Sequence, residues 1–261
     1  MNRIWTYLAA AYIDLRLLAT GKAERDLPPL RLRFVGAGDF RAVGKHLLDL
    51  TLSRGRITTH SRILDIGCGV GRLALPLTEY LRHGQYEGFD VVWRAIRWCK
   101  QHISRTHQNF HFQYVALRNP EYSSRGRSAA EFTFPYQDDT FDCAVAFSVF
   151  THLALNEITN YIREAQRVLV PGGRLVFSCF LLNQESEAAL PSLPEMYRFP
   201  YRDGPVCFTD ATNRGLAVAI EEATLRCILH DVGFRDCVVE YGGWYGREPN
   251  PSFQDLVTCV K

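Results

Sequence analysis

The chain has 261 residues, of which 47% are hydrophobic and 22% are charged. This composition excludes a mainly disordered chain, because burial of so much apolar surface can offset the conformational entropy lost on folding. The 30 basic and 28 acidic side chains leave a formal net charge of only +2, so the charge gives no reason to expect a nucleic-acid partner.

The amino-terminal segment is mostly apolar from residue 4 to residue 19, but Asp14 and Arg16 interrupt it. The run is shorter than the roughly 18–20 residues that a transmembrane helix needs, and no clean cleavage site for a signal peptide follows it. Residues 1–60 contain ten basic and five acidic side chains, which is a net charge of +5. We expect a helix that packs on its own domain or on a partner subunit. Peripheral contact with a membrane surface is the alternative.

From residue 60 onward, short apolar runs alternate with segments of helical periodicity. This alternation predicts an α/β fold with a mostly parallel sheet and helices on both of its faces. The strands are predicted at residues 62–66, 86–90, 110–115, 141–147, 174–180, 234–241 and 253–260. The helices are predicted at residues 71–83, 92–104, 156–169 and 216–231.

Two stretches, residues 118–138 and 183–213, do not fit the alternation, and we expect them to be long loops that cover a site. The sequence contains no internal repeat and no interior linker. We therefore predict a single domain over residues 1–261. It would comprise a helical extension or lid at 1–58 and a core at 59–261.

The eight cysteines form no C-x-x-C pair. Half of them lie inside apolar runs, where a free cysteine behaves as a small hydrophobic residue. We therefore expect a reducing, cytoplasmic compartment and no zinc site. The cysteines in apolar runs are Cys143, Cys179, Cys237 and Cys259.

A glycine-rich loop follows the first predicted strand, in the segment Ile-Leu-Asp-Ile-Gly-Cys-Gly-Val-Gly at residues 63–71. Glycines allow a tight turn and close approach of a ligand to the backbone, and the helix that follows favours anionic groups at its amino terminus. Asp90 ends the second predicted strand, 19 residues after Gly71. An acid at this place can accept hydrogen bonds from both ribose hydroxyls of an adenosine ligand.

The spacing of the glycines distinguishes between adenosine ligands. A dinucleotide fingerprint, G-x-G-x-x-G, would need a third glycine at position 72, where the chain has Arg72. The observed G-x-G-x-G, preceded by Asp65, resembles the first motif of the class I S-adenosylmethionine (SAM)-dependent methyltransferases. The resemblance implies SAM as cofactor and a Rossmann-like, seven-stranded sheet with an antiparallel carboxy-terminal strand. The cofactor-binding residues that it implies are Asp65, Gly67, Cys68, Gly69, Gly71, Asp90, Val91, Asn119 and Ser148.

The resemblance covers nearly the whole chain. Residues 134–142 resemble the family's approach to its fourth strand, and residues 167–173 resemble its Pro-Gly-Gly turn before the fifth. Many relatives bind the adenine amino group with an acid at the end of the third strand, where this chain has Ala116. Adenine would then be held by backbone groups or by Asn119.

Three further segments, residues 35–40, 148–153 and 244–247, are similar to bacterial methyltransferases associated with glycan or secondary-metabolite assembly. Their similarity implies a small-molecule or glycan acceptor. Trp244 and Arg247 would shape the acceptor site, or Trp244 would be core and Arg247 would pair with Asp255. Phe40 would cover the cofactor, or Asp39 would simply cap a helix that runs to Leu50.

Methyl transfer from a sulfonium is an in-line displacement, in which the protein mainly aligns the acceptor and excludes water. A hydroxyl acceptor would need a base, and His152 follows the fourth strand at the edge where ligands bind in open α/β sheets. The alternative for His152 is capping or packing against the next helix. Ser148 and Phe150 flank the same edge and are expected to line the methyl pocket.

The sequence thus predicts an O-methyltransferase, monomeric or homodimeric, with His152 as the catalytic base and no metal. Two alternatives remain open. One is a SAM-binding scaffold or regulatory protein that has lost catalysis, and the other is a nucleotide-dependent oxidoreductase.

Overall fold

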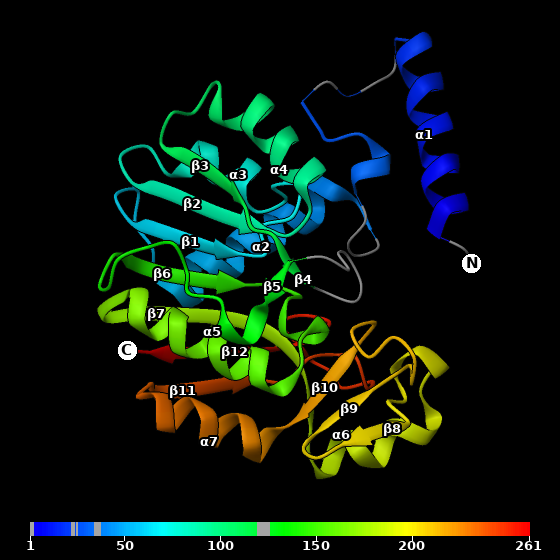
Figure 1. The fold of residues 1–261 in the computed structure, drawn as a ribbon, viewed down its shortest axis with the longest axis vertical. Coiled ribbons are helices and arrows are strands. Elements are labelled where there is room, and N and C mark those ends of the chain that lie inside the picture. Colours follow the sequence, from blue (N-terminus) through cyan, green and yellow to red (C-terminus); the bar gives the residue numbers. More distant parts are fainter. Residues whose placement is uncertain (1–2, 22–23, 25, 34–37, 119–125) are drawn as a thin grey trace.

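The computed structural model describes residues 3–21, 24, 26–33, 38–118 and 126–261. All seven predicted strands are present, and they follow the order β3-β2-β1-β6-β7-β12-β11, in which only β12 runs antiparallel to its neighbours (Figure 1). The predicted fold class is confirmed. The strand bounds are β1 Arg62–Ile66, β2 Gln85–Asp90, β3 Phe110–Tyr114, β6 Phe141–Ala146, β7 Leu169–Leu182, β11 Arg235–Glu240 and β12 Asp255–Val260.

Helices cover both faces of this sheet (Figure 1). Successive strand residues point to opposite faces, so Leu64 and Ile66 pack on the side of α5 while Ile63 packs on the side of α2. Because both faces are buried, the strands read as continuous apolar runs. One face is covered by α2 Phe40–Gly55, α3 Ala74–Tyr80 and α4 Trp93–Cys99. Helix α4 continues as a π-helical turn at Lys100–Ser104. The other face is covered by α5 Leu155–Val168 and α7 Glu222–Val232.

The sheet is larger than predicted, with ten strands among the described residues. Strand β7 extends past its partner β12, whose pairing ends at Cys179, and residues 180–182 then pair in parallel with β10. The helix predicted at 216–231 therefore begins only at Glu222, because the buried residues before it form a strand. The additional strands are β8 Tyr201–Asp203, β9 Val206–Phe208 and β10 Val218–Glu221.

The two expected long loops are thus partly folded. The segment 183–213 contains α6 Gln184–Ala189, two 3-10 turns at Leu190–Ser192 and Glu195–Tyr197, and the strands β8 and β9. Within the segment 118–138, β5 Arg127–Ser128 pairs with β4 Leu117–Arg118, and a 3-10 turn follows at Ala129–Glu131. The prediction of long loops was therefore wrong at these places.

Helix α1 Arg3–Ala19 stands beside the body of the molecule (Figure 1). The buried Asp14 carboxylate ties it to the 3-10 turn at Leu30–Leu32, accepting hydrogen bonds from the Leu30 amide at 2.7 Å and from Arg31 Nη1 at 2.9 Å. The outer side of α1 exposes Tyr12 and Leu15 by 62% and 65%. Among the described residues, no helix has the length and apolar character needed to cross a membrane.

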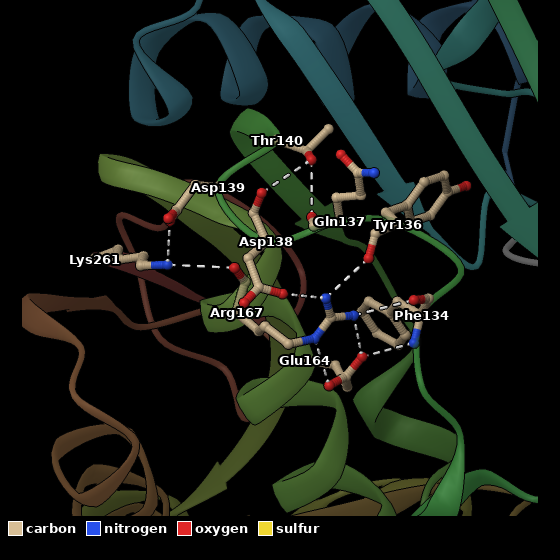
Figure 2. A network of polar contacts seen from close by, with 9 residues as sticks. All are labelled: Phe134, Tyr136, Gln137, Asp138, Asp139, Thr140, Glu164, Arg167 and Lys261. Carbon is tan, nitrogen blue, oxygen red and sulfur yellow. Dashed lines mark hydrogen bonds and ion pairs between the residues drawn. The ribbon is translucent and has the colours of Figure 1, made fainter.

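A network of polar contacts anchors the segment that leads into β6 (Figure 2). Arg167, at the end of α5, donates to both carboxylate oxygens of Glu164 at 2.9 and 2.6 Å and to Asp138 at 2.7 Å. It also donates to the carbonyls of Phe134 and Tyr136 at 3.0 and 2.9 Å. These contacts lie at the amino ends of β6 and β7, so they fix the edge of the sheet opposite the carboxyl ends.

Replacing Arg167 tests this anchoring. Arg167→Ala would leave the nearly buried Glu164 carboxylate without its charge partner, and we expect the free energy of unfolding to fall by about 3 kcal/mol. Arg214→Ala is the matched control, because Arg214 pairs with Asp203 where both side chains are more than half exposed. The control should lose less than about 1 kcal/mol. Urea unfolding measures both changes, and equal losses would contradict a structural role for the network.

Candidate active site

The glycine loop turns sharply between β1 and α3. The amides of Gly67 and Cys68 both donate to the Phe89 carbonyl, at 2.9 and 3.1 Å, which folds the loop against the end of β2. Gly67 has a φ of +72°, and a Cβ there would lie 2.6 Å from a methyl group of Val149. Gly69 also has a positive φ, +53°, but a Cβ there would meet nothing within 4 Å. The loop thus leaves open space above Gly69.

Asp90, at the end of β2, holds the loop from the other side. Its carboxylate accepts hydrogen bonds from the Gly69 amide at 2.8 Å and from the Val92 amide at 2.7 Å. Burial raises the pKa of Asp90 to about 6, although these backbone hydrogen bonds act in the opposite direction. A buried carboxylate is therefore fixed at the position that the sequence assigned to the ribose-binding acid.

Asp65 lies deeper, inside β1. Its carboxylate accepts a hydrogen bond from the Tyr86 hydroxyl at 2.6 Å. Burial raises the pKa of Asp65 to about 7; the Tyr86 hydrogen bond opposes this shift and the nearby Asp90 charge adds to it. Burial also raises the pKa of the Cys68 thiol well above its usual range, so this thiol stays protonated at neutral pH.

A pocket opens at the carboxyl ends of β1, β2 and β6. It brings together most of the predicted site residues. Those that line it are Asp65, Gly67, Cys68, Gly69, Asp90, Val91, Ser148 and His152. Gly71 is not part of the lining, although its φ of +75° shapes the loop. Asn119 lies outside the described residues.

Ser148 and His152 occupy the segment that follows β6. The Ser148 hydroxyl donates to Gln254 Oε1 at 3.0 Å, and the Ser148 amide donates to the hydroxyl of Ser178 at 2.8 Å. His152 Nδ1 lies 2.8 Å from the Gly215 carbonyl oxygen. A carbonyl can only accept, so Nδ1 carries the proton, and in the neutral ring the lone pair is on Nε2.

The structure contradicts two of the roles considered for residues that follow β6. The residue at the amino-terminal cap of α5 is Ala154, so His152 does not occupy the helix-capping position. Phe150 is buried against Phe177, with the ring centroids 4.8 Å apart, and it is not part of the pocket lining. A core position explains Phe150 better than the predicted place in a methyl pocket.

The structure adds pocket residues that the sequence did not indicate. Arg33 and Arg72 line the pocket, and the guanidinium carbon of each lies 5.3 Å from the centre of the Phe40 ring. Phe40 itself is buried and does not line the pocket. Asp39 caps α2 by accepting from the Ala42 amide at 2.8 Å, and the helix runs on to Gly55 rather than ending at Leu50.

Trp244 belongs to the core and not to the pocket. Its Nε1 donates to Asp255 at 2.8 Å, and only 3% of its surface is exposed. Burial raises the pKa of Asp255 to about 6, opposed by hydrogen bonds from two backbone amides and Trp244. Arg247 donates to Glu185, so the alternative in which Arg247 pairs with Asp255 was wrong.

Comparison with known proteins shows that the chain is similar to methyltransferases. Residues 64–177 match the family model described as a methyltransferase domain. A malonyl-[acyl-carrier protein] O-methyltransferase of Geobacter sulfurreducens is 26% identical over 211 residues, which are 78% of this chain and 68% of the relative. A ubiquinone biosynthesis O-methyltransferase of Nitrobacter winogradskyi is 26% identical over 160 residues, 61% of this chain and 52% of the relative. The chain thus spans 68% of the length of the first relative and about half of the length of the second.

The fold has solved counterparts as well. A SAM-dependent methyltransferase from Archaeoglobus fulgidus superposes with a TM-score of 0.56 at 16% identity, over 86% of this chain and 95% of that chain. Residues 64–177, which carry the glycine loop, are thus similar to a methyltransferase domain, and the fold of the chain is similar to that of a solved SAM-dependent methyltransferase. In this chain, the matching domain begins inside β1 and ends inside β7, and it contains the loop, Asp90, Ser148 and His152.

The raised pKa of Asp65 predicts a pH dependence of stability. The folded chain holds the Asp65 proton more tightly than the unfolded chain does, so this group lowers stability progressively as the pH rises from about 4 to about 7. Asp65→Asn can still accept from Tyr86 but cannot ionise. Relative to wild type, we expect this variant to gain about 2 kcal/mol between pH 5 and pH 8.

Urea unfolding at both pH values measures this gain. The control is Asp49→Asn, at an exposed position on α2, whose difference from wild type should stay constant. If the Asp65→Asn and wild-type stabilities ran parallel with pH, Asp65 would not be the group that titrates.

Proposed function

We propose that the chain transfers a methyl group from SAM to a hydroxyl of a small-molecule or sugar acceptor. The observation that carries this proposal is the placement of His152 in the same pocket as the open glycine loop and the buried Asp90 carboxylate. The residues proposed to bind the cofactor and the candidate base therefore line the same pocket.

The residues present fit SAM. The space above Gly69, where a Cβ would meet no atom, suits the methionyl part, and the Asp90 carboxylate keeps lone pairs for the ribose hydroxyls. Cys68 and Val91 line the pocket next to these two groups. When bound, SAM supplies an electrophilic methyl group on a positively charged sulfur.

His152 would take the proton of the acceptor hydroxyl at Nε2. The Gly215 carbonyl fixes the ring orientation through Nδ1, and it continues to accept from Nδ1 after Nε2 is protonated. Ser148, held by Gln254 and Ser178, would position the acceptor beside the methyl group. Both relatives named above are O-methyltransferases, which favours oxygen as the nucleophile.

A SAM-binding protein without catalysis is the second candidate. It is favoured by Ala116, because the family resemblance of the sequence implies an adenine-binding acid at this position. The two candidates share cofactor binding and differ in turnover, so separate experiments test them.

Thermal shift with S-adenosylhomocysteine tests cofactor binding. A ligand at 100 times its Kd stabilises the fold by about 2.7 kcal/mol, which for a domain of this size raises Tm by roughly 5–10 °C. NAD in parallel should give no shift. Asp90→Ala should lose most of the shift, whereas Asp49→Ala should keep it. A cooperatively melting wild type that shows no shift would contradict the proposal.

Replacing His152 tests catalysis once a screen of sugars and phenols with labelled SAM has identified an acceptor. His152→Gln should lower kcat by about 10²–10⁴-fold, because a general base contributes that much. The S-adenosylhomocysteine shift should stay as in wild type. His46→Gln, at an exposed position on α2, is the control. Unchanged turnover would remove His152 as the base.

A further inference from the structure

A second cavity lies between α1, the segment around the 3-10 turn at Leu30–Leu32, and α4. Leu32 and Arg33 line both this groove and the active-site pocket, so the two cavities meet at a shared wall. A long molecule could therefore lie in the groove and present one end to the pocket. None of the sequence motifs accounts for the groove.

Half of the residues that line the groove are leucine, proline or tryptophan. Leu18 and Trp93 are 60% and 51% exposed there, although both are large apolar side chains. Exposed apolar surface of this extent beside a binding pocket marks a place where an apolar partner binds. The apolar lining consists of Leu17, Leu18, Leu27, Pro28, Pro29, Leu30, Leu32, Trp93 and Trp98.

Basic side chains line the same groove and outnumber the acidic ones. Of the two acids, Asp14 already accepts from the Leu30 amide and from Arg31, and Glu24 lies 3.9 Å from Arg33. Arg94 donates to the Tyr7 hydroxyl at 2.9 Å, and the Arg97 guanidinium lies 5.3 Å from the Trp93 ring centre. These last two arginines contact neutral groups, so the charge of the groove favours an anion.

We propose that this groove binds the apolar chain of an anionic amphiphile, and that the amphiphile's hydroxyl is the methyl acceptor. This inference rests on the proposed function. In the reaction, the bond between the sulfonium sulfur and the methyl carbon breaks, and a bond from the acceptor oxygen to that carbon forms. The hydroxyl proton passes to His152 Nε2, and S-adenosylhomocysteine leaves as a neutral thioether.

Binding of alkyl phosphates to the full chain tests the groove directly, without cofactor. Dodecyl, decyl and octyl phosphate, each below its micelle concentration, would be titrated by calorimetry and by tryptophan fluorescence. Each CH₂ group added to a chain inside the groove should tighten binding by about threefold to fourfold. Inorganic phosphate alone should bind at least a hundredfold more weakly than dodecyl phosphate.

Substitutions on α4 test whether dodecyl phosphate binds in the groove. Trp93→Ala and the pair Arg94→Gln with Arg97→Gln, all on α4 rather than on the outlying α1, should each weaken dodecyl phosphate binding by tenfold or more. Leu216→Gln and Arg214→Gln are controls at exposed positions outside the groove, and they should leave binding unchanged. The S-adenosylhomocysteine shift, measured on every variant, verifies the fold and separates this inference from the proposed function.

The inference is overturned if dodecyl phosphate does not bind, if chain length has no effect, or if the α4 variants bind as wild type does. It is also overturned if only phosphatidylglycerol vesicles bind and Tyr12→Gln with Leu15→Gln abolishes that binding. That result would make α1 a membrane contact instead. A retained S-adenosylhomocysteine shift in any of these cases would leave the proposed function standing.

Discussion

The site depends on one interaction, the pair of hydrogen bonds by which the buried Asp90 carboxylate holds the amides of Gly69 and Val92. Burial alone would favour the protonated acid, and its pKa of about 6 still leaves it mostly ionised at neutral pH. The ionised form can then accept from both backbone amides and still offer lone pairs to a ligand. The fold thus retains the buried Asp90 charge, and this charge fixes the glycine loop.

That interaction requires the ends of β1 and β2 to lie side by side, which the doubly covered sheet provides. Parallel pairing places Asp65 opposite Gly88, and the loop then folds back onto the Phe89 carbonyl. A shift of one residue would turn Asp65 to the opposite face of the sheet and would leave Leu64 in its place. The burial of both faces keeps β1 and β2 in the register on which the loop relies.

The local part of this arrangement could be read from the sequence. The glycine loop, Asp90 and the seven main strands are each encoded in short runs, so periodicity and spacing located them. Strand β10 was missed because Val218–Glu221 is short and runs directly into α7, where an apolar run also fits a helix. Phe150 was misplaced because its contact with Phe177 joins residues far apart in the chain. Arg33 reaches the pocket only through the packing of the amino-terminal segment on the core.

The cofactor site and the acceptor site differ in the same way: the first is built from a short run of the chain, and the second from residues far apart in it. The groups proposed to bind SAM come from β1, β2 and the loop between them, and a single strand–loop–helix–strand unit brings them together. The acceptor side combines His152 with Leu32 and Arg33, which lie more than a hundred residues earlier in the chain. Its shape therefore depends on how α1 and the turn after it pack on α4. Because the buried Asp14 carboxylate joins α1 to that turn, a change in the amino-terminal segment would alter the groove and the wall that it shares with the pocket. The glycine loop and Asp90 make no part of that wall.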